Sequence, residues 1–171
     1  SVTGDGNLEI SFLGQMYRVS PQGEVTVSNS SEEISITVKI LLLHYLAQAQ
    51  GVPVQRKLIS FKELPGGSIY IEPFTNRAIR PMVSVFGDNP EKLLEIGKNL
   101  GGEQASLGDA SITLNVLPFV PITLVLWGGD EEFPPTGNIL FDISASHYLP
   151  TEDYAVLASL VVYQLKRLKS V

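Results

Sequence analysis

The stretch that decides the fold is ASITLNVLPFVPITLVLWGGDEEFPPTGNILFDIS, residues 110–144. Two long β-prone runs lie in it, 110–118 and 121–129, and a third follows at 138–144. The first run alternates apolar and polar residues, so one of its faces is predicted to be solvated. The second run is apolar on both faces, which is typical of an interior strand. If the second and third runs pair as a hairpin, the sheet is built around them.

The stretch SNSSEEISITVKILLLHYLAQAQG, residues 28–51, changes to a helical period. Ser30 and Glu33 have the spacing of a capping box at a helix start, and Gly51 closes the segment. Apolar residues cover most of the helix circumference, leaving a narrow polar stripe that contains His44. Such a helix is predicted to lie centrally in the core.

Shorter patterns complete the fold. Residues 8–27 predict a β-meander, and Asn89 with Pro90 predicts a capped helix. A helix is expected to begin at Pro73 and to end or kink at Pro81, and the last helix is expected to have Thr151 as its cap. The predicted fold class is α+β: a single domain, residues 1–171, with a largely antiparallel sheet packed against two long apolar helices plus shorter helices.

Composition restricts the partners. The chain has 171 residues, 44% of them hydrophobic and 18% charged, and its net charge is −6. No basic patch extends beyond LKRLKS at the C-terminus, which argues against nucleic acid and against anionic membranes. The low charge predicts either a large core or an uncharged surface that meets a partner.

The chain contains no cysteine, which excludes disulfides, thiolate nucleophiles and cysteine-ligated metals. No apolar run approaches the roughly 20 residues of a membrane span, and no charged-then-apolar leader is present. A cytoplasmic location is expected, although the absence of a leader does not establish it. The chain begins with Ser1, and we expect either a whole domain or one excised from a longer protein.

His147 lies between the strand-like run that ends in DIS and the last helix. A histidine on a loop between rigid elements is a candidate ligand for a small molecule or metal, and Tyr148 beside it would contribute. The alternative is a structural histidine that fixes this corner. Asp142, five residues upstream, could orient the imidazole.

The acidic run Asp130-Glu131-Glu132 is a candidate site for Mg²⁺ or Ca²⁺, which prefer oxygen ligands. Adjacent carboxylates point in different directions, so a solvated loop is the alternative. In the predicted hairpin this run and His147 lie at opposite ends, roughly 20 Å apart, and cannot share one metal. No nucleophile is paired with a base, so no catalytic residue is predicted, and no cofactor can be named.

Several strings together resemble an uncharacterised prokaryotic family, domain of unknown function 3786. They include ILLLHYL, LISFKELPGG, RAIRPMVSVFGDNPEK, NLGG, VLPFVPITLVLWGGDEEFP and ILFDISASHYLPTEDYAVLASL. The resemblance covers about residues 36–162. It implies a place in the metabolism of anaerobic bacteria and archaea, with iron–sulfur or corrinoid proteins as context, because some relatives carry a cysteine-rich iron–sulfur module.

Three functions stay open on this basis. The first is a non-catalytic module that binds a ligand, cofactor or partner protein near His147. The second is a carboxylate- or metal-assisted hydrolase or lyase that uses the acidic run with Asp142. The third is a structural domain of a multidomain protein, which predicts an exposed apolar patch and no closed pocket.

Overall fold

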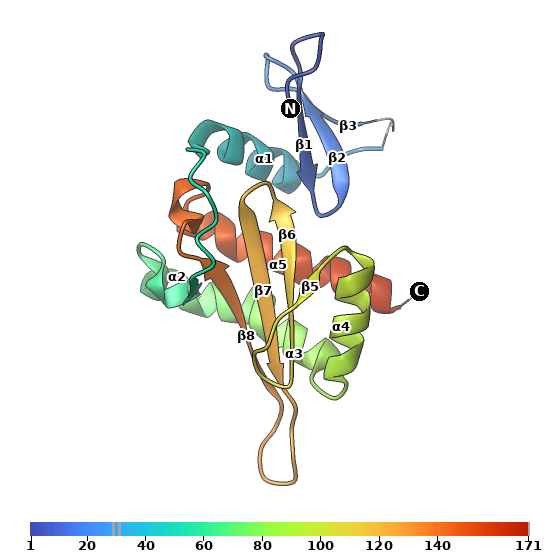
Figure 1. Ribbon diagram of the computed structural model, residues 1–171, viewed down its shortest axis with the longest axis vertical. Coiled ribbons are helices and arrows are strands. Elements are labelled where there is room, and N and C mark those ends of the chain that lie inside the picture. Colours follow the sequence, from blue (N-terminus) through green and yellow to red (C-terminus); the bar gives the residue numbers. More distant parts are fainter. Residues whose placement is uncertain (29, 31, 171) are drawn as a thin grey trace.

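A small sheet follows from the alternating pattern near the N-terminus. In the computed structural model, which describes residues 1–28, 30 and 32–170, three strands pair antiparallel in the order β1-β2-β3. They are β1 (Leu8–Phe12), β2 (Gln15–Val19) and β3 (Val25–Val27). The predicted β-meander is confirmed. Its buried side chains join the same hydrophobic core as the rest of the molecule, and the whole is one compact α+β fold (Figure 1).

The larger sheet is antiparallel and has the order β4-β8-β7-β6-β5. Its strands are β4 (Leu58–Ser60), β5 (Glu103–Gln104), β6 (Ala110–Leu117), β7 (Val120–Trp127) and β8 (Thr136–Asp142). The run that is apolar on both faces is therefore the central strand, as predicted. The predicted hairpin between β7 and β8 is also confirmed.

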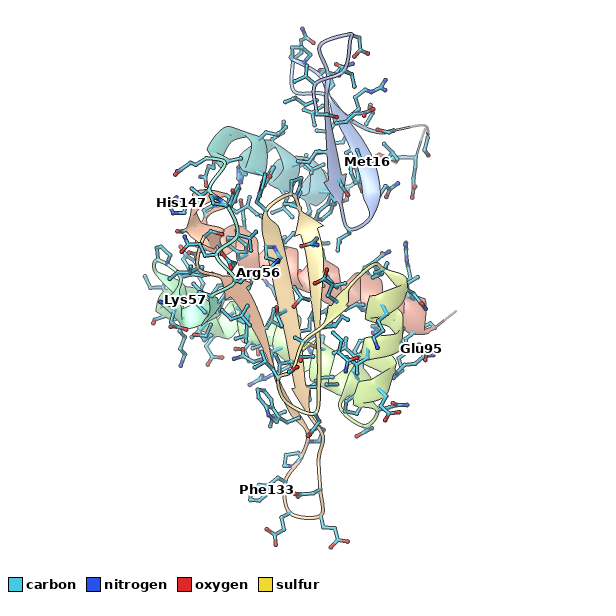
Figure 2. All side chains as sticks on the ribbon, viewed as in Figure 1. Met16, Arg56, Lys57, Glu95, Phe133 and His147 are labelled. Carbon is cyan, nitrogen blue, oxygen red and sulfur yellow. The ribbon has the colours of Figure 1, made fainter. Side chains whose placement is uncertain are left out.

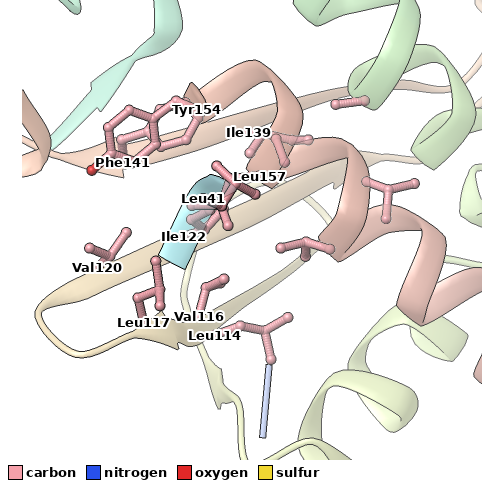
Figure 3. Close-up of a cluster of buried hydrophobic side chains, with 14 of the residues drawn as sticks. Leu41, Leu114, Val116, Leu117, Val120, Ile122, Ile139, Phe141, Tyr154 and Leu157 are labelled. Atoms are coloured by element: carbon pink, nitrogen blue, oxygen red, sulfur yellow. The ribbon is translucent and has the colours of Figure 1, made fainter. Parts of the chain in front are cut away.

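The two faces of this sheet differ in character. Directly paired residues of antiparallel strands share a face, so Leu114, Ile122 and Phe141 lie together. These side chains are buried against the helix α5 (Thr151–Lys169), where Phe141 meets Tyr154 edge to face (Figure 3). The opposite face carries the polar partners of the same strands.

Helices cover only the apolar face. α2 (Gly67–Phe74), α3 (Arg80–Phe86) and α4 (Pro90–Asn99) join α5 there, and in Figure 1 α5 and α3 run behind the strands. Asn89 caps α4 as predicted, since its side chain accepts a hydrogen bond from the Lys92 N–H. None of the helices in the described part of the chain has the length and apolar character needed to cross a membrane.

The first long helix differs from the prediction. α1 (Ile36–Gln48) begins after Ser35, whose hydroxyl accepts a hydrogen bond from the Val38 N–H. The predicted capping box is wrong, because the Ser30 hydroxyl is used locally and accepts from the Glu32 N–H. The helix is also less central than expected: Leu41, Leu42 and Tyr45 are buried, whereas the opposite apolar face is exposed.

The helix expected to begin at Pro73 begins earlier, at Gly67, and runs through both prolines. Gly66 has a φ of +72°, which turns the chain into the helix after the short helical turn Phe61–Glu63. A π-helical turn, Thr75–Ile79, joins α2 to α3, with the Arg80 N–H bonded to the Thr75 carbonyl. A π turn widens the helix before Pro81, which offers no N–H of its own.

The last helix begins at Thr151, but this residue is not its cap. The Thr151 hydroxyl donates instead to the Pro65 carbonyl, 2.7 Å away, and Pro150 occupies the N-cap position without a side-chain bond. The last helix is thereby bonded to the turn that starts α2. The predicted acidic first turn and basic last turn are both present.

Candidate functional site

A groove of about 500 Å³ lies on the helix-free face of the larger sheet, within the size range of small-molecule sites. Its floor consists of two rows of paired residues. One row contains Glu103, Thr113 and Thr123. The next contains the pair Asn115 and Pro121, with the pair Asp142 and Leu58 at the ends of β8 and β4. The lining is completed by Gln104 and Ala105 on β5 and by Val54, Arg56 and Leu58.

The segment from residue 50 to residue 57, which we call the strap, forms one wall of this groove. It connects α1 to β4 and lies beside the sheet on the side away from α5 (Figure 1). Figure 2 shows Arg56 on the strap, far from Phe133 at the tip of the β7–β8 hairpin. The wall on the other side is the edge strand β5.

Asp142, the last residue of β8, fixes the strap to the sheet. Its side chain is 2% exposed, and Oδ1 accepts hydrogen bonds from the Gln55 N–H and from the N–H and hydroxyl of Ser144. Oδ2 is buried and has no hydrogen-bond partner among the residues that the structure describes. Because a buried carboxylate needs such donors, the strap and the turn after β8 are held together at this point.

The charge state of Asp142 follows from the same contacts. Burial raises the pKa of its carboxyl, but the hydrogen bonds from Ser144 and Gln55 and the nearby N–H of Arg56 outweigh this effect. The net result is a lowered pKa, so Asp142 is a carboxylate at neutral pH. The Arg56 N–H contributes to this lowering without completing a hydrogen bond to Oδ2.

Arg56 has a backbone φ of +56°, the left-handed region that non-glycine residues rarely adopt. The conformation costs about 1–2 kcal/mol, which the surrounding contacts must offset. Those contacts include the Asp142 hydrogen bond at Gln55 and the bond from the Ile143 N–H to the Lys57 carbonyl. They place the exposed Arg56 guanidinium at the groove, where it makes no hydrogen bond or ion pair within the described part of the chain.

His147 and Tyr148 fix the other end of the strap. The His147 imidazole Nδ1 lies 2.8 Å from the Gln50 side-chain oxygen, and the Gln50 N–H donates to the His147 carbonyl. The Tyr148 hydroxyl donates to the carbonyl of Val52. Both residues lie in or beside the short 3-10 turn Ala145–His147, so the corner anticipated as a ligand site contacts the strap directly.

Two of the predicted relationships at this corner are not present. Asp142 does not orient His147, because Asp142 bonds Ser144 and the strap while His147 bonds Gln50. Tyr148 is fully buried, and its ring stacks between Tyr45 and Phe119, which leaves no face open to a ligand. Of the three residues proposed to bind a ligand, only Asp142 lines the groove.

The other histidine is also paired. His44 Nδ1 lies 2.7 Å from a carboxylate oxygen of Asp153, which joins the exposed side of α1 to the first turn of α5. The polar stripe predicted on α1 therefore contacts α5 through His44.

The acidic run lies at the tip of the β7–β8 hairpin, as expected. Asp130 accepts hydrogen bonds from the N–H groups of Glu132 and Phe133, which lowers the pKa of its carboxyl and shapes the loop. Glu131 and Glu132 are exposed. In the described residues no group of three or more His, Asp and Glu side chains is placed to hold a metal ion. A metal site at Asp130, Glu131 and Glu132 stays a prediction.

The groove combines the Arg56 cation at one wall, the exposed Glu103 carboxylate at the other, and a floor of neutral polar groups above the buried Asp142 carboxylate; among its described lining residues no nucleophile is paired with a base. Such a site can bind a ligand by hydrogen bonds and ion pairs. The alternation of Thr113 and Asn115 with apolar residues indicated this face in the sequence. Arg56 and Glu103 were not identified. The sequence shows neither that residue 56 has a positive φ nor that the strap and β5 lie beside the same face of the sheet.

The comparisons with known proteins identify the family only. The model of the family described as "Domain of unknown function (DUF3786)" matches residues 1–164, which includes the N-terminal sheet beyond the strings noted above. No curated protein and no solved structure matches the chain.

Proposed function

The chain belongs to the DUF3786 family of domains of unknown function, and from the geometry of its groove we propose that it is a non-catalytic binding module for a small polar ligand. One observation carries the proposal: at a groove wall Arg56, which has no side-chain partner among the described residues, adopts a strained conformation that the buried Asp142 maintains. Backbone strain that persists at a ligand-sized groove is typical of functional sites.

In this proposal the residues near β8 have separate roles. Asp142 lines the groove and positions the strap, whereas His147 and Tyr148 act at a distance by fixing residues 50 and 52. The neutral donors and acceptors of Thr113 and Asn115 contact the ligand, whereas Thr123 is buried beneath them and bonds the Thr113 hydroxyl. A cytoplasmic location in anaerobic metabolism belongs to the proposal as well, and it rests on the family resemblance alone.

The test is a nuclear magnetic resonance titration of ¹⁵N-labelled protein with a fragment library of amines, carboxylates, amides and phosphates. We expect hits to shift the amide signals of Arg56, Thr113 and Thr123 together. Thr113→Val, which removes a partly exposed floor hydroxyl at nearly constant volume, should weaken these hits. Hits that leave all three signals unchanged and cluster elsewhere contradict the proposal.

A second function has one observation in its favour. Ile36, Ile40 and Leu43 follow the i, i+4, i+7 spacing of one helix face and are 69%, 43% and 36% exposed. This is the apolar patch expected of a structural domain in a larger protein. The two functions differ in a measurable way, because substitutions on this face leave the groove and its fragment hits unchanged.

A further inference from the structure

Two side chains of opposite charge stand at the two walls of the groove. Arg56 lies on the strap and Glu103 on β5; both are exposed, and neither forms an ion pair in the part of the chain that the structure describes. Between them the accessible polar side chains, Thr113 and Asn115, are neutral, and the Asp142 carboxylate is buried. Thr113 and Thr123 bond each other through their hydroxyls at 2.8 Å, and Asn115 is exposed in the adjacent row.

The strand register sets how far apart these charges lie. Glu103 pairs with Thr113, Thr113 with Thr123, and Thr123 with Leu140, so β5 and β8 are three strand spacings apart, roughly 14 Å between backbones. The strap that carries Arg56 is bonded to the end of β8 through Asp142. Arg56 and Glu103 are both exposed at these walls, and in the part of the chain that the structure describes they do not pair with each other across the groove.

We propose that the ligand is a zwitterion whose carboxylate pairs with Arg56 and whose ammonium pairs with Glu103. The inference rests on the proposed binding function and adds the class of ligand. A planar guanidinium matches a carboxylate in a bidentate manner, and a single cation near an acidic wall disfavours multiply charged anions. The neutral floor suits an amide group between the two charges.

The two sources of such a ligand are short peptides and free amino acids. The end groups of an extended dipeptide lie roughly 7 Å apart, and an ion-pair contact of about 3 Å at each end brings the span to roughly 13 Å, which suits charges on opposite walls better than the shorter separation in one amino acid. The dipeptide is therefore the expected form.

The experiment titrates the ¹⁵N-labelled full chain with alanyl-alanine, its N-acetyl form, its C-terminal amide and free alanine. We expect alanyl-alanine to shift the amide signals of Arg56, Thr113 and Thr123, and each blocked peptide to bind at least about tenfold more weakly, since each loses one charge-assisted pair. Alanine that binds as tightly as the dipeptide supports the zwitterion and assigns the source to free amino acids.

Two variants assign each end of the ligand. Arg56→Gln should remove the difference between alanyl-alanine and its amide, and Glu103→Gln the difference between alanyl-alanine and its N-acetyl form. Lys57→Gln is the matched control, because Lys57 is exposed beside Arg56 but does not line the groove. It should leave both differences unchanged.

The outcomes separate the two proposals. Equal binding of free and blocked peptides overturns the zwitterion. So does an absence of peptide binding while other fragments bind in the groove, and in both cases the binding module stands. If neither peptides nor fragments shift the groove signals, both proposals fail.

Discussion

At the scale of single residues, Arg56 adopts a strained backbone conformation that lowers the stability of the fold and places its side chain at the groove wall. Its φ of +56° costs free energy that a glycine at the same place would not lose. Arg56→Gly relieves the strain in the folded state but also gives the unfolded chain more conformational entropy. The two effects oppose each other, so the variant should leave the free energy of unfolding unchanged or raise it by up to about 1 kcal/mol. Urea denaturation measures this, and the same variant should lose dipeptide binding.

Arg56→Val is the matched control for the strain. A β-branched residue at positive φ is more strained than arginine, so Val should lower the free energy of unfolding by about 1–2 kcal/mol. Equal stability of the Gly and Val variants would show that the conformation of residue 56 relaxes freely.

Asp142 gives a prediction about pH. Because its pKa is lowered in the folded state, the stability it contributes is present above the unfolded value of about 3.9 and is lost as the pH falls through the folded pKa. At neutral pH Asp142→Asn should cost about 2 kcal/mol, since it replaces hydrogen bonds to a charge. Denaturation curves at pH 7 and pH 3 should show that this cost shrinks in acid; a cost that stays constant contradicts the assignment.

At the scale of elements, the turn into α2 depends on two adjacent glycines with different constraints. A Cβ on Gly67 would lie 1.9 Å from the Phe61 carbonyl oxygen, whereas a Cβ on Gly66 meets nothing within 4 Å but has a positive φ. Gly67→Ala should cost about 3 kcal/mol of unfolding free energy and Gly66→Ala about 1 kcal/mol. Thermal denaturation ranks the pair, and the reverse order would mean that the backbone clash relaxes.

The strap gives a second prediction at this scale. His147→Ala removes one half-exposed hydrogen bond to Gln50, while Tyr148 and Asp142 still hold the strap. It should lower the free energy of unfolding by no more than about 1 kcal/mol and leave dipeptide affinity nearly unchanged. A large loss of binding at constant stability would restore His147 as a ligand residue.

Elements also show what the sequence could predict. The strands β6, β7 and β8, the interior place of β7 and its hairpin with β8 were predicted from alternation and from one run that is apolar on both faces, because strand faces follow a period of two; the pairing of β6 with β7 was not. The start of α1 and the path through Pro81 did not follow. Ser30 and Ser35 both offer cap chemistry, and only tertiary packing decides between them; a π turn that accommodates a proline has no local signature.

At the scale of the whole molecule, some apolar side chains are buried in the core and others are exposed, even on the same helix. α1 buries Leu41 and Leu42 but exposes Ile36 and Ile40 on its other face. Each substitution, Ile36→Gln or Ile40→Gln, should change the free energy of unfolding by no more than about 0.5 kcal/mol. Leu41→Ala should lower the same free energy by about 2–5 kcal/mol. Chemical denaturation checks the contrast, and a large loss from the isoleucine pair would mean that this face is packed.

The asymmetry of the larger sheet explains why the candidate site was only partly visible in the sequence. The prediction that one face of β6 is solvated came from Thr113 and Asn115, and Asp142 was singled out because it lies five residues before His147. The groove itself forms because the strap and β5 meet that face from distant parts of the chain. Contacts of this kind depend on the fold as a whole.

The long β7–β8 hairpin has a practical consequence. Its tip at Glu132 is exposed, and six residue steps along β8 alone put roughly 20 Å between the base of the loop and Asp142. Since the chain has no cysteine, Glu132→Cys would provide a unique thiol for a dye or a biotin anchor. Immobilised by that handle, the protein would present its groove away from the sensor surface.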